Sequence, residues 1–285
     1  MTMTEVFNMM YGKYFEPLPS KDAYLERIGL AGKEIPLTKE GLDMLQWAQL
    51  KNVPFENIDI YDYDVKVDFM VDELFDKVVN KGRGGYCFEL NAIFMALLKS
   101  VGFEVYSVGV RIIMGGGDDY IPAIAHRGII AVIDGKRYYA DVGFGMTNAP
   151  AASICIEDSD KQDIAGQTFH VEDRPYNNKM IIQHYKTGPA NLFLFSADPF
   201  HDVDFIAYNN NMQVTGWRAK RIANLRTQDG AISVDGDIFR ETVGEQRTET
   251  KINSPQEALE ILNSKFGMKL TKPLRLDATD ANFPF

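Results

Sequence analysis

The first hundred residues carry apolar side chains at the three-to-four-residue spacing of α-helices. Three stretches show this spacing: residues 38–53, 74–79 and 87–101. Thr38 stands where a helix N-cap is expected, and Gly102 stands where a helix-ending glycine is expected. We therefore predict a helical N-terminal part. We expect Met9 and Met10 to be packed in its first helix.

The next part of the chain changes to the pattern of β-strands. Residues 104–112 and 127–133 are rich in β-branched side chains, and the Asp-Gly pair at 134–135 is typical of a two-residue hairpin turn. Further Asp-Gly pairs at 229–230 and 235–236 predict more antiparallel hairpins. The order is therefore helices, then an antiparallel β part.

A mixed segment ends the chain. Ser254, Pro255 and Glu257 combine a capping box with proline at the first helical position, and Gly267 closes the helix that they open. No internal repeat and no low-complexity linker interrupts this order.

Composition narrows the class of protein. Of the 285 residues 45% are hydrophobic and 12% aromatic, which is typical of a globular chain with a real core. No run approaches the roughly 18 apolar residues of a membrane span, and the N-terminus lacks the pattern of a secretory signal. We therefore expect a cytoplasmic protein with Cys87 and Cys155 as free thiols.

Charge and histidine placement exclude further classes. The net charge of -10 argues against binding to nucleic acid or to an anionic membrane, although one local basic pocket for a phosphorylated molecule stays possible. His170, His184 and His201 show no metal-ligand spacing with cysteines or paired acids. We expect neither a nucleic-acid partner, nor a membrane partner, nor a metal.

Cys87 is the first candidate for chemistry. A glycine-rich loop, residues 81–85, delivers it to the first turn of a predicted helix, where free N–H groups and the helix dipole favour a thiolate. We therefore expect the helix terminus, together with a neighbouring imidazolium, to lower the pKa of Cys87 well below the roughly 8.5 of a free thiol. The same N–H groups could stabilise an oxyanion. Taken alone, Cys87 is equally compatible with a buried structural cysteine.

The predicted hairpin brings a histidine and an aspartate together. If residues 134–135 form its turn, His126 and Asp141 become diagonal neighbours on one face of the two strands. The Cβ atoms of such diagonal pairs lie roughly 7–8 Å apart, so an imidazole and a carboxylate can reach each other in a hydrogen bond. A slip by one residue would place them on opposite faces. Gly128, opposite Asp141, leaves room for the imidazole ring.

These three side chains together form a generalised catalytic triad. Cys87 would be the nucleophile, His126 its base, and Asp141 the group that orients the imidazole. Singly, the histidine could be a hydrogen-bonded core residue and the aspartate a cap at the end of a strand. Together they favour an enzyme that forms a covalent intermediate.

Several motifs add a family resemblance. Residues 83–91, RGGYCFELN, closely resemble the nucleophile motif of the arylamine N-acetyltransferases. Residues 53–57 (VPFEN), 126–127 (HR) and 140–145 (ADVGFG) match other signatures of that family in the same order. Residues 24–29 also look like the family's N-terminal helix. The resemblance is strong over roughly residues 20 to 150 and loose beyond.

The resemblance implies an α+β fold in three domains. These are a helical N-terminal domain (1–102), an antiparallel β-barrel-like middle domain (103–210) and a C-terminal α/β lid (211–285). It implies acetyl-CoA as donor, an aromatic amine or hydrazine as acceptor, and a ping-pong mechanism. The triad of that family falls on Cys87, His126 and Asp141, the residues reached above by spacing.

The resemblance also suggests residues that contact the substrates. Phe55 and Phe144 match positions of the acceptor pocket, and ordinary core packing would explain them equally well. Gly143 and Gly145 are candidates for contacts with CoA. Independently of the resemblance, Arg218 lies in a basic run, residues 217–221, which with Arg226 could bind the phosphates of CoA or could belong to a solvated surface. Three other functions stay open: a hydrolytic or transglutaminase-like cysteine enzyme, an amide synthase of the same fold, and a non-catalytic binding module.

Overall fold

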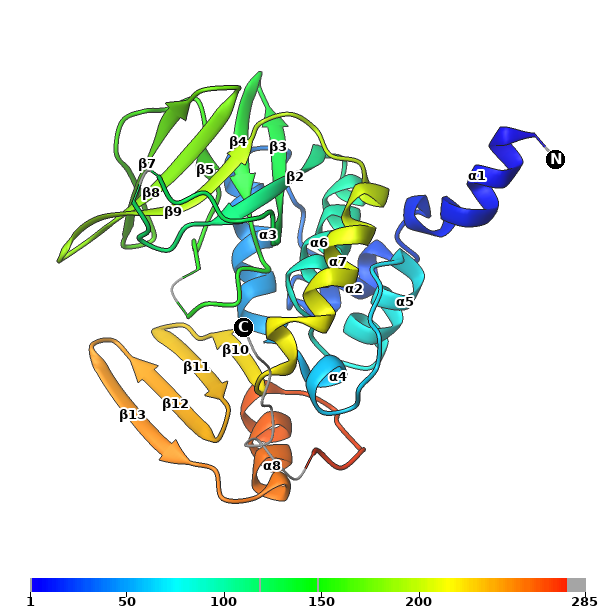
Figure 1. Cartoon of the computed structure of the whole chain (residues 1–285), viewed down its shortest axis with the longest axis vertical. Coiled ribbons are helices and arrows are strands. Elements are labelled where there is room, and N and C mark those ends of the chain that lie inside the picture. The colour runs from blue at the N-terminus through cyan, green and yellow to red at the C-terminus, as the bar shows by residue number, and fades with distance from the viewer. Residues whose placement is uncertain (1, 118, 148, 276–285) are drawn as a thin grey trace.

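The structure is a computed structural model and describes residues 2–117, 119–147 and 149–275. It confirms the predicted α+β fold. A helical part packs against an eight-stranded antiparallel, barrel-like sheet, and a five-stranded sheet with its own helix completes the molecule (Figure 1).

The helical part is built around α6. Its helices are α1 (Met3–Tyr11), η1 (Gly12–Phe15), α2 (Lys21–Arg27), α3 (Lys39–Asn52), α4 (Ile58–Tyr61), α5 (Val71–Phe75), η2 (Asp76–Asn80) and α6 (Cys87–Val101). The side chain of Thr38 caps α3, as predicted. Gly102 ends α6 with a φ of 117°, a left-handed conformation that favours glycine. Eleven of the fifteen residues of α6 are buried, so this helix forms the centre of the core.

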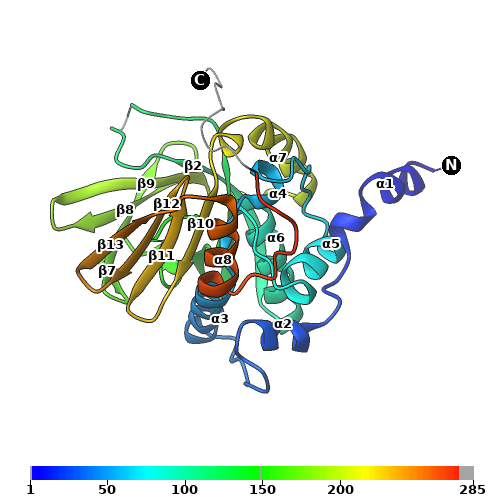
Figure 2. The same ribbon diagram turned by 90° about the horizontal axis from the view of Figure 1, so that it is seen from below.

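The first helix differs from the prediction. A capping box between Thr2 and Glu5 stabilises α1 locally, yet none of its residues is buried. Met9 and Met10 are 70% and 57% exposed, and α1 projects from the body (Figures 1 and 2). The expectation that these methionines pack in the core is therefore wrong.

The eight-stranded sheet carries the predicted hairpin. Its strands are β2 (Glu104–Ile112), β3 (His126–Ile133), β4 (Lys136–Ala140), β5 (Ile154–Cys155), β6 (Gln162–Ile164), β7 (Gln167–Arg174), β8 (Asn178–Tyr185) and β9 (Gly188–Ser196). They are ordered β5-β4-β3-β2-β9-β8-β7-β6. Ile133 pairs with Lys136 and Ile129 with Ala140, which confirms the predicted register.

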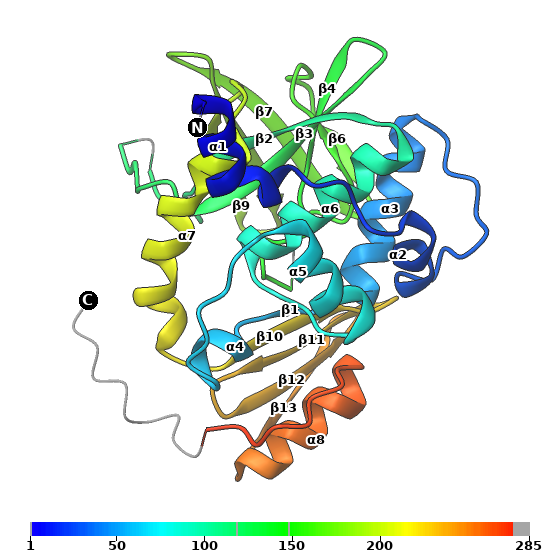
Figure 3. The same ribbon diagram turned by 90° about the vertical axis from the view of Figure 1, so that its right-hand side faces the viewer.

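The five-stranded sheet joins distant parts of the chain. Its strands are β1 (Phe55–Glu56), β10 (Ile222–Arg226), β11 (Gly230–Asp235), β12 (Ile238–Val243) and β13 (Gln246–Lys251), in that order. Alternate residues such as Ala223, Ile232 and Phe239 form a core with α8 (Pro255–Phe266), which covers one face (Figures 2 and 3). Ser254 and Gly267 cap α8 as predicted.

Helix α7 (Phe205–Val214) links the sheets, between the short helices η3 (Asp202–Asp204) and η4 (Gly216–Arg218). It packs through Phe205 against Phe88 of α6. The predicted boundary between the second and third domains, at residue 210, falls inside α7. The division into three domains at residues 102 and 210 stays a prediction. No helix within the described part of the chain is long and apolar enough to cross a membrane.

Candidate active site

A cavity of about 400 Å³ opens where the two sheets meet the first residue of α6. The ends of β2 and β3, the loop after β4, α7 and the uncovered face of the five-stranded sheet all contribute to it. Cys87 and His126 both line it, and Asp141 lies directly behind His126. The predicted triad therefore comes together at one cavity.

Cys87 begins α6 and is only 2% exposed. Its thiol lies 3.9 Å from the carbonyl oxygen of Ala125, to which it can donate. Arg83 fixes the preceding loop, because its guanidinium pairs with Glu56 at 2.7 Å and with Asp59 at 2.9 Å. The sulfur thus has a defined position at the helix terminus.

The surroundings of Cys87 correct one expectation. Burial, and next the negative charge of Asp141, raise the pKa of the Cys87 thiol, although the backbone N–H groups of Phe88 and Cys87 act in the opposite direction. The expected lowering by the helix terminus is therefore outweighed, because a buried thiolate loses its hydration. A thiolate here needs a base that takes its proton and stays beside it as a cation.

His126 is placed to be that base. Its Nε2 lies 2.6 Å from Oδ2 of Asp141, within the 3.2 Å that the predicted hairpin geometry requires. Phe193 stacks on the imidazole at 5.9 Å between centroids, and Phe144 meets it edge-on at 6.2 Å. Because Asp141 occupies Nε2, Nδ1 is the ring nitrogen that remains for the proton of Cys87.

Asp141 is fully buried and accepts four hydrogen bonds. His126 and the hydroxyl of Tyr139 reach Oδ2 at 2.6 and 2.8 Å. The amide of Asn91 and the backbone N–H of Gly143 donate to Oδ1 at 3.0 and 2.8 Å. Burial alone would raise the pKa of Asp141, but His126 and the hydrogen bonds outweigh it and hold this pKa below its ordinary value. The carboxylate therefore stays ionised.

Two glycines allow this close packing. A Cβ on Gly143 would lie 2.8 Å from Cα of Cys87, so the loop after β4 can approach the nucleophile only with glycine there. A Cβ on Gly128 would lie 2.4 Å from the ring of Tyr139. The space at Gly128 therefore holds the Tyr139 ring, and the expectation that it receives the imidazole of His126 is wrong.

The other predicted residues divide into two groups. Gly143, Phe144 and Gly145 line the cavity. Phe55 does not line it but lies under Gly145, whose Cβ would come within 2.6 Å of the Phe55 ring. Arg218 is not among the lining residues, because its guanidinium pairs with Asp64 and donates to a backbone carbonyl of α7.

Sequence reasoning missed two groups of residues. Asn91 and Tyr139 hold Asp141, and their signals were present: Asn91 lies one helical turn after Cys87, and Tyr139 lies on β4, two residues before Asp141. Two arginines of the five-stranded sheet, Arg240 and Arg247, also line the cavity, together with Lys220 from the basic run that precedes β10. No sequence signal placed Arg240 and Arg247 there, since the sheet pairing decides which face they occupy.

Within residues 2–275, apart from the two undescribed positions 118 and 148, no cluster of three or more His, Cys, Asp or Glu side chains could hold a metal ion. Both cysteines carry free thiols.

Comparison with known proteins places the chain in a family. A model described as N-acetyltransferase matches residues 38–275. Arylamine N-acetyltransferase 1 of Bos taurus is 34% identical over 277 residues, which cover 89% of this chain and 95% of the bovine protein. The chain belongs to the arylamine N-acetyltransferase family. Arylamine N-acetyltransferase 1 of Oryctolagus cuniculus is 26% identical over 279 residues, with the same coverage. As an arylamine N-acetyltransferase family member, the protein is an acyltransferase.

Solved structures share the whole fold. The arylamine N-acetyltransferase of Salmonella typhimurium matches with a TM-score of 0.83 at 20% identity, covering 94% of this chain and 96% of that one. The Mycobacterium marinum enzyme in complex with CoA matches with a TM-score of 0.79 at 23% identity, covering 88% and 93%. These likenesses establish the arylamine N-acetyltransferase fold.

Proposed function

We propose that this protein transfers an acetyl group from acetyl-CoA to an aromatic amine or hydrazine through an acetyl thioester on Cys87. The observation that carries the proposal is the 2.6 Å contact between His126 Nε2 and Asp141 Oδ2 beside the buried thiol. Membership of the arylamine N-acetyltransferase family supports the classes of donor and acceptor. The two free cysteines fit a cytoplasmic location, where thiols are kept reduced.

The first half-reaction loads the enzyme. The proton of the Cys87 thiol passes to Nδ1 of His126 as the sulfur attacks the thioester carbonyl of acetyl-CoA. Asp141 stabilises the imidazolium, and N–H groups at the start of α6 stabilise the oxyanion. The bond from the carbonyl carbon to the CoA sulfur then breaks. CoA leaves as a thiol with the proton held by His126, and the acetyl group stays on Cys87.

The second half-reaction releases the product. The nitrogen of the amine attacks the acetyl carbon on Cys87 and gives a proton to His126. The bond between carbon and Cys87 sulfur breaks, and the thiol recovers its proton. Because the pKa of Asp141 is held below its ordinary value, the carboxylate remains charged throughout and keeps His126 in the tautomer that accepts at Nδ1.

We place the phosphates of CoA along the five-stranded sheet. Lys220, Arg240 and Arg247 line the cavity, and among the described residues they pair with two carboxylates, Asp235 and Glu249. One positive charge is therefore in excess, and phosphate oxygens can compete for these donors. This cluster takes the role first assigned to Arg218, whose guanidinium is engaged elsewhere. Gly143 and Gly145 remain candidates for close backbone contacts.

The acceptor would lie against an apolar wall. Phe144 lines the cavity with Trp217 and three methionines, which are Met114, Met146 and Met212. Aromatic rings and polarisable thioethers suit a flat aromatic amine. Phe55 acts through Trp217, on which it packs at 5.3 Å between centroids.

Initial-rate kinetics test the proposal. A ping-pong enzyme gives parallel double-reciprocal lines when acetyl-CoA is varied at several fixed concentrations of an aniline. A hydrolytic enzyme would release CoA equally fast with and without the aniline, and a binding module would release none. Intersecting lines would mean that both substrates must bind together, which rules out a free acetyl-enzyme.

A further inference from the structure

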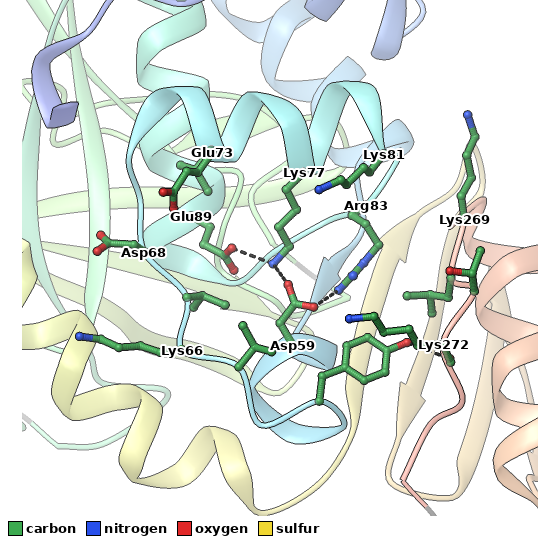
Figure 4. A pocket seen from close by; sticks show the side chains of 16 residues that line it. Asp59, Lys66, Asp68, Glu73, Lys77, Lys81, Arg83, Glu89, Lys269 and Lys272 are labelled. Carbon is green, nitrogen blue, oxygen red and sulfur yellow. Dashed lines mark hydrogen bonds and ion pairs between the residues drawn. The ribbon is translucent and has the colours of Figure 1, made fainter.

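Two loops flank the cavity at Cys87, and the first of them is anchored inside the helical part. This loop, residues 81–86, leads into α6, where Oε2 of Glu89 accepts the backbone N–H of Tyr86 at 3.1 Å. The ammonium of Lys77 lies 2.7 Å from the other oxygen of Glu89 (Figure 4). This loop is therefore held by side chains of the helical part itself.

The second loop, residues 141–147, follows β4 and is anchored at its two ends by different parts of the chain. At its start, the backbone N–H of Gly143 donates to Oδ1 of Asp141 at 2.8 Å. At its far end, the carbonyl oxygen of Gly145 accepts a hydrogen bond from Nδ2 of Asn224 at 2.6 Å. The triad therefore fixes one end of this loop, and the five-stranded sheet fixes the other.

A second side chain of β10 reaches the same end of the loop. The guanidinium of Arg226 donates to the carbonyl oxygen of Thr147, and it lies 5.6 Å from the ring centre of Trp47 in α3. Asn224 and Arg226 are two residues apart on one strand, so both side chains point to the same face of the sheet. That face is opposite to α8, because the alternate residue Ala223 packs in the core with α8. β10 therefore presents two hydrogen-bond donors to this loop.

The backbone of Gly145 has little freedom between these contacts. Its φ is 71°, in the left-handed region that favours glycine. A Cβ at this position would lie 2.6 Å from the ring of Phe55, and Phe55 is the residue that pairs with Asn224 across β1 and β10. Gly145 is thus packed on Phe55 and hydrogen-bonded to Asn224. The five-stranded sheet therefore sets the position of this residue.

Phe144 lies between the two anchored ends and forms part of the cavity wall. Its ring meets Phe193 edge-on at 4.7 Å and His126 at 6.2 Å between centroids. His126 does not depend on this ring for its place, because Asp141 binds the imidazole and Phe193 stacks on it. Loss of the far anchors would therefore move the wall that faces an aromatic acceptor and leave the nucleophile and its base in place.

We propose that Asn224 and Arg226 are positioning residues for the acceptor half-reaction. They hold the far end of the loop so that Phe144 forms the wall against which the aromatic ring of the acceptor lies. These roles rest on the proposed acetyl transfer, and they give β10 control over the preference for aromatic over small acceptors. Arg226 is not among the described residues that line the cavity, so it can act only through the loop.

Separate measurement of the two half-reactions tests these roles. Release of CoA in the absence of an acceptor gives the rate at which Cys87 is loaded. Decay of the acetyl-enzyme with aniline or with hydrazine gives the rate of transfer to each acceptor. Hydrazine is a small nucleophile without a ring, so it does not need the wall at Phe144.

The test variants are Asn224→Ala and Arg226→Met, which each remove one donor to the loop and add no negative charge to the cavity. We expect each change to lower the second-order rate constant for aniline at least about threefold, and the two together about tenfold, because each removes one hydrogen bond that holds the wall. The rate of loading and the rate with hydrazine should stay unchanged.

Two further variants are the controls. Arg226→Lys keeps a donor at this place, and we expect it to retain most of the rate with aniline. Asn211→Ala makes the same change at an exposed asparagine of α7, and it should leave the rates with both acceptors unchanged. Thermal denaturation checks that every variant is folded.

An unchanged ratio of the aniline rate to the hydrazine rate in the folded variants overturns the proposal. A loss with Asn224→Ala alone also overturns it, because that result would mean a direct contact between Asn224 and the acceptor. A wild-type enzyme that acetyl-CoA does not load at Cys87 would refute the proposed function instead, so the two failures are distinguishable.

Discussion

Replacement of Asp141 by asparagine is the sharpest probe of the triad, because the structure decides how the new amide would lie. Two groups that can only donate face one end of the side chain: the N–H of Gly143, and the amide of Asn91. The Asn91 amide cannot turn around, since its Nδ2 also donates to a backbone carbonyl and its Oδ1 accepts a backbone N–H. The oxygen of the new amide must therefore point to them.

Its nitrogen then points to His126 and Tyr139. The two N–H groups of the amide can donate to Nε2 of His126 and to the hydroxyl oxygen of Tyr139, so both contacts and the fold are kept, and only the O–H of Tyr139 loses its acceptor. Nε2 becomes an acceptor, and the ring proton moves to Nδ1. The imidazole can then no longer take the proton of Cys87.

The expected loss follows from the tautomer and from the missing charge. In serine proteases, the change from aspartate to asparagine at the equivalent place in the triad lowers turnover by about 10⁴. A thiol is more acidic than a serine hydroxyl, so we expect a smaller loss here, of at least about a hundredfold in kcat/KM. That factor corresponds to about 2.7 kcal/mol of transition-state stabilisation.

Steady-state acetylation of an aniline measures this loss, with circular dichroism as the check on folding. Asp134→Asn is the matched control, because it makes the same chemical change at an exposed turn residue, and it should leave turnover unchanged. A folded Asp141→Asn enzyme that keeps turnover within tenfold of the wild type would refute the orienting role of Asp141.

Three further perturbations follow from the same geometry. Because burial raises the pKa of the Cys87 thiol, the thiolate depends on His126 as its base. His126→Gln should therefore slow the alkylation of Cys87 by iodoacetamide at least about tenfold at pH 7 and leave the alkylation of Cys155 unchanged. Equal rates for Cys87 in wild type and variant would show that His126 is not the base. The pKa of Asp141 lies below its ordinary 3.8 in the folded protein, so its charge stabilises the fold above about pH 4, and this stabilisation is lost as the pH falls through the lower folded pKa. Urea unfolding should therefore show that the difference in unfolding free energy between wild type and Asp141→Asn disappears in that acidic range. A difference that stays constant with pH would contradict the lowered pKa. Gly143→Ala should abolish turnover, because its Cβ would lie 2.8 Å from Cα of Cys87; normal turnover would mean that the loop moves freely.

Short-range sequence patterns predicted most of the secondary structure. Helix caps at Thr38 and Ser254 and the hairpin turn at 134–135 were readable, because each depends on a few neighbouring residues. The register of that hairpin then placed His126 beside Asp141 without any knowledge of the rest of the chain. This part of the site could be predicted because strand pairing advances in fixed steps.

Features that depend on long-range packing could not be read in this way. The pKa of Cys87 depends on how deeply the sheets and α7 bury it, and the local helix terminus suggested the wrong direction. Arg240 and Arg247 reach the cavity only because the five-stranded sheet folds over it. The prediction that Met9 and Met10 are packed was wrong for a related reason, because apolar residues in a helix do not indicate whether another element covers them.

The central claim is that Cys87 carries the acetyl group. Mass spectrometry of the intact protein after brief exposure to acetyl-CoA without an amine tests it directly, followed by peptide mapping. We predict one acetyl group, on Cys87, which an added aniline removes and which Cys87→Ser does not form. An unmodified wild-type chain, or an acetyl group on Cys155 in place of Cys87, contradicts the account.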